Sequence, residues 1–237
     1  VIYNYNKNMK LPDKILPIPC SDKKKWREKW HNGRNMLNIP HSFRLLAIGP
    51  PDSGKTTLIK NIILRADPPF KKILVYHFSD TTSEWSDIDG KKIKDLDPLA
   101  YEGNNDKTII IIDDCNFKNA NKDLKYKINR LFGYTSSHCN VSICITAQNP
   151  YDISPEIRRM ANLICLWKNH DMNSLKTLAS RTGLKAKQIE FIMIYLLKNP
   201  HDFLMIDLQA NSPATYRING YTKLDLNKLD EAIKKLK

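Results

Sequence analysis

The chain has 237 residues, of which 41% are hydrophobic and 27% are charged, and 38 Lys and Arg against 25 Asp and Glu give a formal net charge of +13. This composition excludes a disordered, collagen-like or low-complexity chain and indicates a globular protein with a substantial core. The basic excess predicts a polyanionic partner such as nucleic acid, although scattered solubilising lysines would give the same total.

The charge is unevenly distributed along the chain. Residues 1–40 carry nine basic and three acidic side chains, residues 41–168 carry 18 and 15, and residues 169–237 carry 11 and 7, so the net charges are +6, +3 and +4. We therefore predict three parts: a basic N-terminal arm and helix (1–40), a nearly neutral core (41–168), and a helical and strand-containing extension (169–237) that completes the same domain.

No apolar stretch reaches the roughly 20 residues needed to cross a bilayer, and the first residues lack the hydrophobic run of a signal peptide. The cysteines form no CxxC pair and no Cys/His cluster at metal-ligand spacing, so we expect reduced core thiols in an intracellular protein. The five cysteines are Cys20, Cys115, Cys139, Cys144 and Cys165.

The first 40 residues predict an arm followed by a helix. Three prolines within residues 1–20 favour an extended segment, and Ser21–Met36 has the pattern of a short helix with Trp26 and Trp30 on one face. We expect the two tryptophans to dock this basic helix onto the core rather than to stack on nucleic-acid bases.

From residue 43 onwards, short aliphatic runs alternate with helical patterns, which is typical of a mostly parallel sheet with crossover helices on both faces. Between the second and third strands, the polar segment Ser79–Asp106 has only Trp85 and Leu99 as evident anchors. The predicted strands are Leu45–Gly49, Ile73–Phe78, Thr108–Asp113, Val141–Thr146 and Asn162–Trp167, and the predicted helices are Gly54–Arg65, Asp123–Ser136 and Pro155–Met160.

The last third of the chain continues with helices and strands. Its apolar run Phe191–Leu197 (FIMIYLL) is too continuous for a one-sided helix, so we expect it to be buried within the chain or covered by a neighbouring subunit. The predicted elements are helices Asn173–Ser180 and Lys185–Lys198, a strand Phe203–Leu208, a hairpin partner near Thr215–Asn219 and a helix from Asp225.

The segment Gly49–Thr56 (GPPDSGKT) fits the phosphate-loop pattern GxxxxGK[ST]. A strand leads into it and a helix leaves it, so backbone N–H groups are expected to surround a β-phosphate at the positive end of a helix dipole. Lys55 would reach the β- and γ-phosphates, and Thr56 would ligate Mg²⁺. The alternative, an ordinary glycine turn, does not require Lys-Thr after the second glycine. The predicted nucleotide-binding residues are Gly49, Pro50, Pro51, Asp52, Ser53, Gly54, Lys55, Thr56 and Thr57.

Four consecutive isoleucines lead into Asp113 and Asp114. Such a run predicts a buried central strand whose final carboxylates emerge beside the phosphate loop. Asp113 is the expected Walker B acid, which holds Mg²⁺ through water, and Asp114 is the expected general base for the attacking water. The alternative for Asp114 is a capping or turn aspartate. The order KNHD in Lys168–Asp171 does not fit the guanine-reading NKxD motif of Ras-like GTPases.

The strand Val141–Thr146 is followed by Ala147-Gln148-Asn149-Pro150. A polar residue at the tip of the strand beside Walker B is placed to touch both the γ-phosphate and the attacking water. We expect Gln148, or otherwise Thr146, to act as this sensor.

In their order along the chain, these three elements resemble the genome-packaging ATPases of poxviruses and other large DNA viruses, a branch of the FtsK–HerA superfamily of DNA pumps. The resemblance covers about half of the chain, from Leu45 to Trp167, and includes Ser137–Ser142 and Pro155–Arg158. Size and the basic, Asn/Lys-rich composition are most similar to the virophage (Sputnik-like) members. The resemblance implies an α/β P-loop NTPase of the additional-strand (ASCE, RecA-like) type.

The same resemblance implies a function. It predicts a homo-oligomeric ring, pentamer or hexamer, that uses ATP and Mg²⁺ to pump double-stranded DNA, without sequence specificity, into a preformed capsid while docked on capsid vertex proteins. No membrane is involved, and the protein would work in the host cytoplasm or a viral factory, or with the virion. Two other classes stay open: a DNA pump or nucleotide-gated assembly factor that does not package, and a P-loop kinase, against which the carboxylate after Walker B argues.

This chain departs from the family's pattern at one arginine. Family members often carry Gly-Arg-His before the sensor strand, whereas this chain has Ser136-Ser137-His138. If that arginine acts across a subunit boundary, its role must move to Arg158, Arg159 or Arg130. Arg158 matches the family's Pro-x-x-Arg position and is preferred, with Arg159 second; the alternative is that both pair with surface carboxylates.

The segment Lys118–Arg130, directly after Walker B, is a candidate for the DNA contact, because lysines on a pore-facing element bind phosphates without reading sequence. A solvated lysine face is the usual alternative for such a run. Its basic residues are Lys118, Lys122, Lys125, Lys127 and Arg130.

Overall fold

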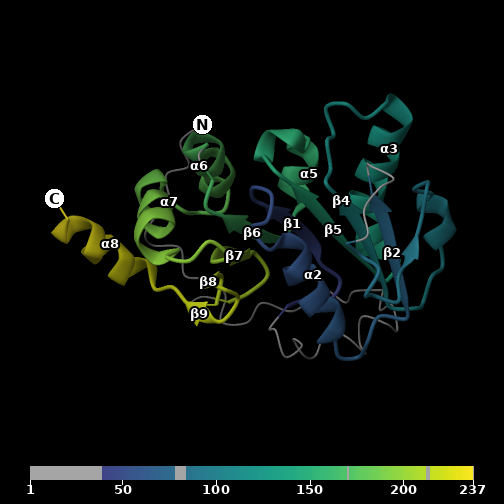
Figure 1. Ribbon diagram of the computed structural model, residues 1–237, viewed down its shortest axis with the longest axis horizontal. Coiled ribbons are helices and arrows are strands. Elements are labelled where there is room, and N and C mark those ends of the chain that lie inside the picture. Colours follow the sequence, from purple (N-terminus) through teal and green to yellow (C-terminus); the bar gives the residue numbers. More distant parts are fainter. Residues whose placement is uncertain (1–38, 78–83, 170, 212–213, 237) are drawn as a thin grey trace, which may run out of the picture.

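The computed structural model describes residues 39–77, 84–169, 171–211 and 214–236, and the predicted arm and tryptophan helix lie outside them. The described residues form one nine-stranded sheet in the order β3-β2-β4-β5-β1-β6-β7-β8-β9 (Figure 1). The strands are β1 (Arg44–Ile48), β2 (Lys72–His77), β3 (Lys91–Lys92), β4 (Thr108–Asp113), β5 (Val141–Ala147), β6 (Leu163–Trp167), β7 (Phe203–Asp207), β8 (Tyr216–Ile218) and β9 (Thr222–Lys223).

The strands from β3 to β6 are parallel, and β7, β8 and β9 extend the sheet in antiparallel fashion. Strand β5 lies between β1 and β4, which is the additional strand predicted from the sequence. Every residue of β4, β5 and β6 is buried, because helices or loops cover both faces of the central sheet. The parallel strands therefore end at one edge, where polar residues that follow them meet.

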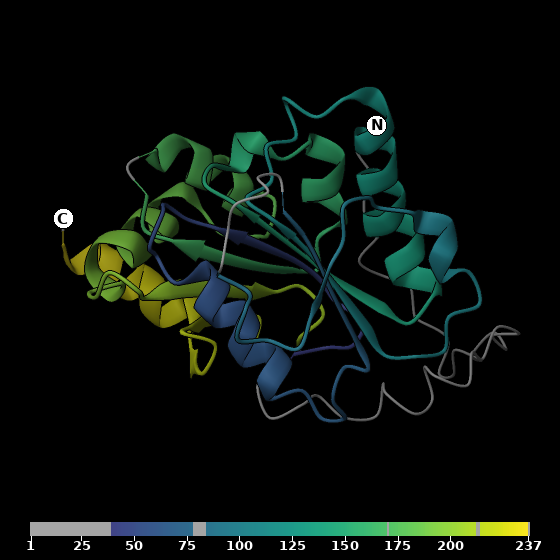
Figure 2. The same cartoon turned by 45° about the vertical axis from the view of Figure 1, so that its right-hand side comes forward.

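The helices divide unequally between the two faces. On one face, α2 buries Ile59, Ile62 and Ile63 in a core shared with the loop that carries Trp85. The other helices pack into a second core on the opposite face, and Figure 2 shows the sheet between α2 and those helices. The helices are α2 (Lys55–Leu64), α3 (Lys122–Arg130), α4 (Ser136–His138), α5 (Pro155–Met160), α6 (Met172–Ser180), α7 (Ala186–Phe191) and α8 (Leu226–Lys235).

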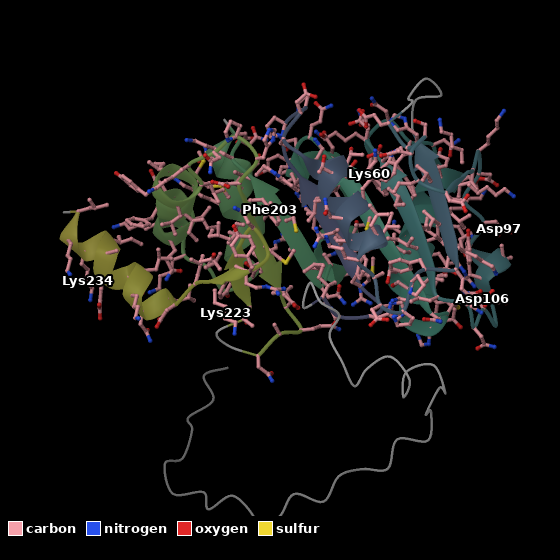
Figure 3. The ribbon with its side chains drawn as sticks, turned by 60° about the horizontal axis from the view of Figure 1, so that its bottom comes forward. Lys60, Asp97, Asp106, Phe203, Lys223 and Lys234 are labelled. Carbon is pink, nitrogen blue, oxygen red and sulfur yellow. The ribbon has the colours of Figure 1, made fainter. Side chains whose placement is uncertain are left out.

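The extension after residue 168 is continuous with this sheet, since β6 pairs with β7 along five residue pairs. Helix α8, which carries Lys234, projects at one end of the molecule (Figure 3). It contacts the body through buried Leu229 and through Asp230, whose carboxylate accepts hydrogen bonds from Lys185 and Gln188. No described helix is both long and apolar enough to span a bilayer.

Two predicted helices are interrupted by wider turns. The helix predicted over Asp123–Ser136 is α3, a π-helical turn η2 (Leu131–Thr135) and then α4. The π-helical turn coincides with close packing, because a Cβ on its Gly133 would lie 2.9 Å from the sulfur of Met160. Similarly, α7 continues as the π-helical turn η4 (Ile192–Leu196). Helical periodicity alone does not reveal either change of pitch.

One burial prediction keeps only one of its alternatives, and another is wrong. The run FIMIYLL buries Ile192, Met193 and Leu197, but Ile194 and Tyr195 are each 49% exposed, so it is not fully buried within the described chain, and cover by a neighbouring subunit stays a prediction. Leu99 is 59% exposed because it belongs to a surface 3₁₀ turn, η1 (Pro98–Tyr101). In its place Ile88 and Leu96 anchor the segment with Trp85.

The four described cysteines are buried free thiols, as predicted, and Cys20 lies outside the described residues. Burial raises the pKa of Cys115 to about 12 and also raises the pKa values of Cys144 and Cys165. These three side chains therefore stay protonated near neutral pH and have the character of small core residues.

A buried lysine gives the fold a testable pH dependence. Burial lowers the pKa of Lys107 from 10.5 to about 8, an effect that Asp67 partly opposes. Between these two values the unfolded chain binds more protons, so the stability gained at this residue rises with pH. We expect the melting temperature of the protein, minus that of Lys107→Met, to increase from pH 8 to pH 10.5. A difference that is flat or falls over this range would contradict the assignment.

Candidate active site

The phosphate loop connects β1 to α2 with the backbone that the motif requires. Asp52 and Gly54 have positive φ values of 57° and 101°, and Gly54 stands at the N-cap of α2 without a side-chain cap. The first N–H groups of α2 therefore have no partner within the helix and face the loop, where a phosphate would accept them. Lys55 donates from Nζ to the carbonyl oxygens of Gly49 (2.9 Å) and Pro50 (2.8 Å), which holds its ammonium over the loop.

The phosphate loop also contacts residues that are far away in sequence. The N–H of Gly49 donates to the carbonyl of Ala147 (3.1 Å), and a Cβ at Gly49 would lie 2.7 Å from the Cβ of Trp167. His201 Nδ1 lies 3.3 Å from the Ser53 carbonyl, and the Trp167 indole donates to the carbonyl of His201 (3.2 Å). Sequence reasoning missed His201, because no motif marks it.

The two aspartates after β4 have different surroundings. Asp113 is 4% exposed, and its two oxygens accept hydrogen bonds from the Trp85 indole (2.7 Å) and the Thr146 hydroxyl (2.6 Å). The imidazole Nε2 of His77 lies 3.7 Å from the same carboxylate. Asp114 is exposed and stands in a turn with φ of 50°. One carboxylate is thus fixed inside the protein, and the other is free to face a ligand.

The tip of β5 connects to both aspartates, through two different residues. The Thr146 hydroxyl accepts from the N–H of Asp114 (2.7 Å) while donating to Asp113, so it fixes the turn between them. Gln148 is exposed, and its Nε2 lies 3.3 Å from Asp114 Oδ1. The two sensor candidates therefore have separate positions: Thr146 is a buried positioning group, and Gln148 contacts the outer carboxylate.

Four carboxylates lie around the lysine of the loop. Burial lowers the pKa of Lys55, and Asp114, Asp113, Glu84 and Asp52, in that order of strength, oppose this change. Glu84 also accepts a hydrogen bond from the Thr56 hydroxyl (3.4 Å). Neither Glu84 nor the Trp85 contact to Asp113 was predicted, since both come from a polar segment without periodicity.

The donor set of this site is suited to Mg²⁺. A hydroxyl at Thr56 and the carboxylate of Asp113 supply only oxygen atoms, which Mg²⁺ prefers, while water and nucleotide phosphates usually complete its octahedral shell. Among the described residues, no group of three or more His, Cys, Asp or Glu side chains forms a metal site of its own. A magnesium ion bound with a nucleotide would have Thr56 as a ligand and Asp113 as a ligand through water, and it would stabilise phosphate charge.

The three arginine-finger candidates have different environments. Arg130 pairs with Glu102 (3.4 Å), and Arg159 pairs with Glu156 (3.5 Å) on the surface. Arg158 donates from Nη1 to the Pro150 carbonyl (3.1 Å), and its Nε is buried with no partner among the described residues. The predicted pairing with surface carboxylates thus fits Arg159 and not Arg158.

The predicted DNA-contacting segment is partly neutralised. Lys127 pairs with Asp95 and Asp123 (both 2.9 Å), and Arg130 with Glu102. Lys118 lies 4.0 Å from Asp152, and the Lys125 ammonium donates to the carbonyl of Lys118. Carboxylates therefore engage Lys127 and Arg130 closely, whereas Lys118 and Lys125 keep their charge at the surface.

Fold and site define a P-loop ATPase. Residues 45–166 match the family model described as "ATPase family associated with various cellular activities (AAA)", and the chain belongs to this family. It accordingly binds and hydrolyses ATP. No curated protein sequence matches the chain.

Solved structures with the same fold include viral packaging enzymes. The DNA-packaging ATPase B204 from Sulfolobus Turreted Icosahedral Virus is similar with a TM-score of 0.55 and 18% identity, over 75% of this chain and 97% of B204. B204 of Sulfolobus turreted icosahedral virus 2 with sulfate has a TM-score of 0.55 and 20% identity, over 76% and 96%. The pCW3 conjugation coupling protein TcpA has a TM-score of 0.50 and 16% identity, over 83% and 66%.

The loop lysine gives the first functional prediction. Replacing Lys55 by Ala removes the cation that lies over the loop, so we expect ATP affinity to fall at least about tenfold, in line with a lost charge-assisted contact of about 1.5–3 kcal/mol. The measurement is titration with a fluorescent ATP analogue. Lys187→Ala, an exposed lysine of α7, is the matched control. Unchanged affinity in the Lys55 variant would contradict the site.

The Thr146 hydroxyl, which bridges Asp113 and Asp114, gives the second functional prediction. In Thr146→Val the side-chain shape is retained, but Asp113 and the N–H of Asp114 lose a partner, so we expect turnover to fall while ATP still binds. Stability should fall by about 1–3 kcal/mol, as for a buried group left unsatisfied. Thr108→Val is the control, because Thr108 is buried at the other end of β4 and donates to the Asp106 carbonyl. Equal turnover in both variants would refute the positioning role.

Proposed function

We propose that the chain is the motor of a viral genome-packaging machine that drives double-stranded DNA into a preformed capsid. The observation that carries this proposal is the extent of the likeness to B204, described as a DNA-packaging ATPase, of which 97% is covered. For TcpA the covered share is 66%, so a coupling protein would need parts that this likeness does not include. A DNA pump outside packaging is the second candidate, and TcpA is the observation in its favour.

The site supports hydrolysis by a simple division of roles. Backbone N–H groups at the start of α2 and the Lys55 ammonium would bind the phosphates, and Thr56 and Asp113 would hold Mg²⁺ with the nucleotide. Asp114, exposed and within 3.3 Å of Gln148 Nε2, would accept a proton from the attacking water. Gln148 would orient that water, and its contacts would change when hydrolysis consumes the water. Asp113 is less suited to the base role, because it is buried and hydrogen-bonded to Trp85 and Thr146.

The motor would work as a homo-oligomeric ring of five or six subunits, in the host cytoplasm or a viral factory. An arginine from a neighbouring subunit would complete each site, and Arg158 is the preferred residue because it stands at the Pro-x-x-Arg position, whereas Arg130 and Arg159 each pair with a carboxylate. Basic residues would contact the DNA backbone without reading bases, and capsid vertex proteins would dock the ring. Size and Asn/Lys-rich composition support a virophage-type member.

Assembly-dependent activity tests the proposal. If neighbouring subunits complete the site, ATP turnover per subunit should rise steeply with protein concentration, and duplex DNA should raise it further at low concentration. The measurement is phosphate release against protein concentration, with and without duplex DNA. Specific activity that is flat and indifferent to DNA would overturn the ring motor while leaving the ATPase assignment intact.

Asp114→Asn separates a motor from a nucleotide-gated assembly factor. The amide retains shape and Gln148 as a neighbour but cannot accept the proton, so we expect ATP binding to persist and turnover to fall about 10²-fold or more. Displacement of a third strand from duplex DNA should also stop, because it requires hydrolysis. Normal strand displacement by this variant would exclude Asp114 as the base.

A further inference from the structure

The phosphate loop lies between two groups of strands. In the order of the sheet, β5 and β4 stand on one side of β1, and β6 and β7 stand on the other. Asp113 and Asp114, at the end of β4, and Gln148, after β5, belong to the first side. Figure 1 shows β2 and β4 on one side of α2, and β7 and β8 on the other. The hydrolytic residues therefore all lie on the β4 side of the loop.

This asymmetry gives a bound triphosphate a direction. A magnesium ion held by Thr56 and, through water, by Asp113 would contact the β- and γ-phosphates, and the water beside Asp114 would attack the γ-phosphate. The γ end of the chain therefore points toward β4 and β5. Because the loop binds the phosphates between its two ends, the nucleoside must leave the loop on the side of β6 and β7.

His201, which precedes β7, lies against the loop on that second side. Its Nδ1 is 3.3 Å from the Ser53 carbonyl oxygen, and a Cβ added to Gly54 would lie 3.7 Å from the same nitrogen. His201 is exposed, whereas Trp167 beneath it is buried. The imidazole thus stands next to the last residues of the loop and is open to a ligand.

The hydrogen-bonding capacity of His201 favours the nucleoside over the phosphates. With its proton on Nδ1, the neutral ring donates to the Ser53 carbonyl, and Nε2 is left as an acceptor. Nε2 has no hydrogen-bond donor within the part of the chain that the structure describes. Phosphate oxygens cannot supply one, since they are acceptors, but ribose hydroxyls and base amines can. The ring also offers an aromatic face on which a base can stack.

The segment that carries His201 is held in place before any ligand binds. The Asp202 carboxylate accepts hydrogen bonds from the N–H of Asn199 (2.8 Å) and from Nδ2 of Asn219 (2.8 Å), and these bonds lower the pKa of Asp202. The Trp167 indole donates to the His201 carbonyl (3.2 Å). A contact from a preorganised residue costs little conformational entropy, so it contributes more to affinity.

We propose that His201 binds the nucleoside part of the nucleotide whose phosphates occupy the loop of the same chain. The phosphate loop would supply affinity for any triphosphate, and His201 would add the contact that distinguishes a nucleoside triphosphate from triphosphate alone. The extension after β6 thereby becomes part of substrate recognition. This inference rests on the ATPase assignment and not on DNA packaging, so it can fail or hold independently of the packaging function.

Comparison of two ligands tests the proposal. A non-hydrolysable ATP analogue has a nucleoside, and tripolyphosphate does not, so calorimetric titration of both with Mg²⁺ separates His201 from the loop. In His201→Asn the amide N–H stands near the position of Nδ1 and can still donate to Ser53, but the ring and Nε2 are lost. We expect about tenfold weaker binding of the analogue and unchanged binding of tripolyphosphate.

Two further variants complete this comparison. His201→Ala should lower the ratio of analogue affinity to tripolyphosphate affinity by about the same factor as His201→Asn, and Lys187→Ala, at an exposed position of α7, should leave the ratio unchanged. Equal changes for the two ligands in both His201 variants would show that His201 only supports the loop. That result, or an unchanged affinity for the analogue, would overturn the proposal.

Nuclear magnetic resonance tests the contact in the unaltered protein. The ring protons of His201 can be assigned by their absence from the His201→Asn spectrum. With the ATP analogue at saturation, we expect nuclear Overhauser effects between these protons and protons of the ribose or the base. Their absence in the saturated complex would contradict a direct contact, whatever the affinities show.

Discussion

The arrangement of the catalytic edge depends on one hydroxyl group. Thr146 donates to Asp113 and accepts from the N–H of Asp114, so the ends of β4 and β5 are joined at the point where the two carboxylates diverge. A hydroxyl has one donor and two acceptor sites, and this bridge uses the donor and one acceptor. A hydrogen-bonded Asp113 stays inside while Asp114, in a left-handed turn, faces outward. Chemically similar neighbours thereby acquire different tasks from their surroundings.

The residues after 168 are part of the nucleotide site and not an accessory to it. Strand β7 continues the sheet beside β6, His201 lies against the Ser53 carbonyl, and Trp167 supports both. On the other side, Asn149 donates to Asp171, the N-cap of α6. Both the phosphate loop and the sensor loop therefore contact the extension, so a displacement of either loop must move residues that belong to it.

Sequence patterns predicted the parallel core well, because each central strand is an aliphatic run with a sharp polar end. The bounds of β4 and α5 were predicted without error. Strand β4 begins after a lysine and ends at a pair of aspartates, and α5 begins at a Ser-Pro sequence. What the patterns lacked were contacts between segments. Trp85 donates to Asp113 and Glu84 accepts from Thr56 across a polar stretch with no period. The π-helical turns were missed because local propensity does not encode them.

The net charge of the chain overstates its free basic surface, because many basic side chains pair with carboxylates of the same chain. Three basic residues in Lys118–Arg130 lie near or pair with carboxylates, and Lys71 and Lys72 share Asp106, so much of the described basic surface is neutralised locally. Scattered lysines of this kind add solubility but little directional attraction, because exposed ion pairs are weak and screened by salt. The arginines between α5 and α6 differ in that they converge on a cavity without a carboxylate. Local pairing, and not the net charge of +13, therefore decides which basic residues remain without a carboxylate partner.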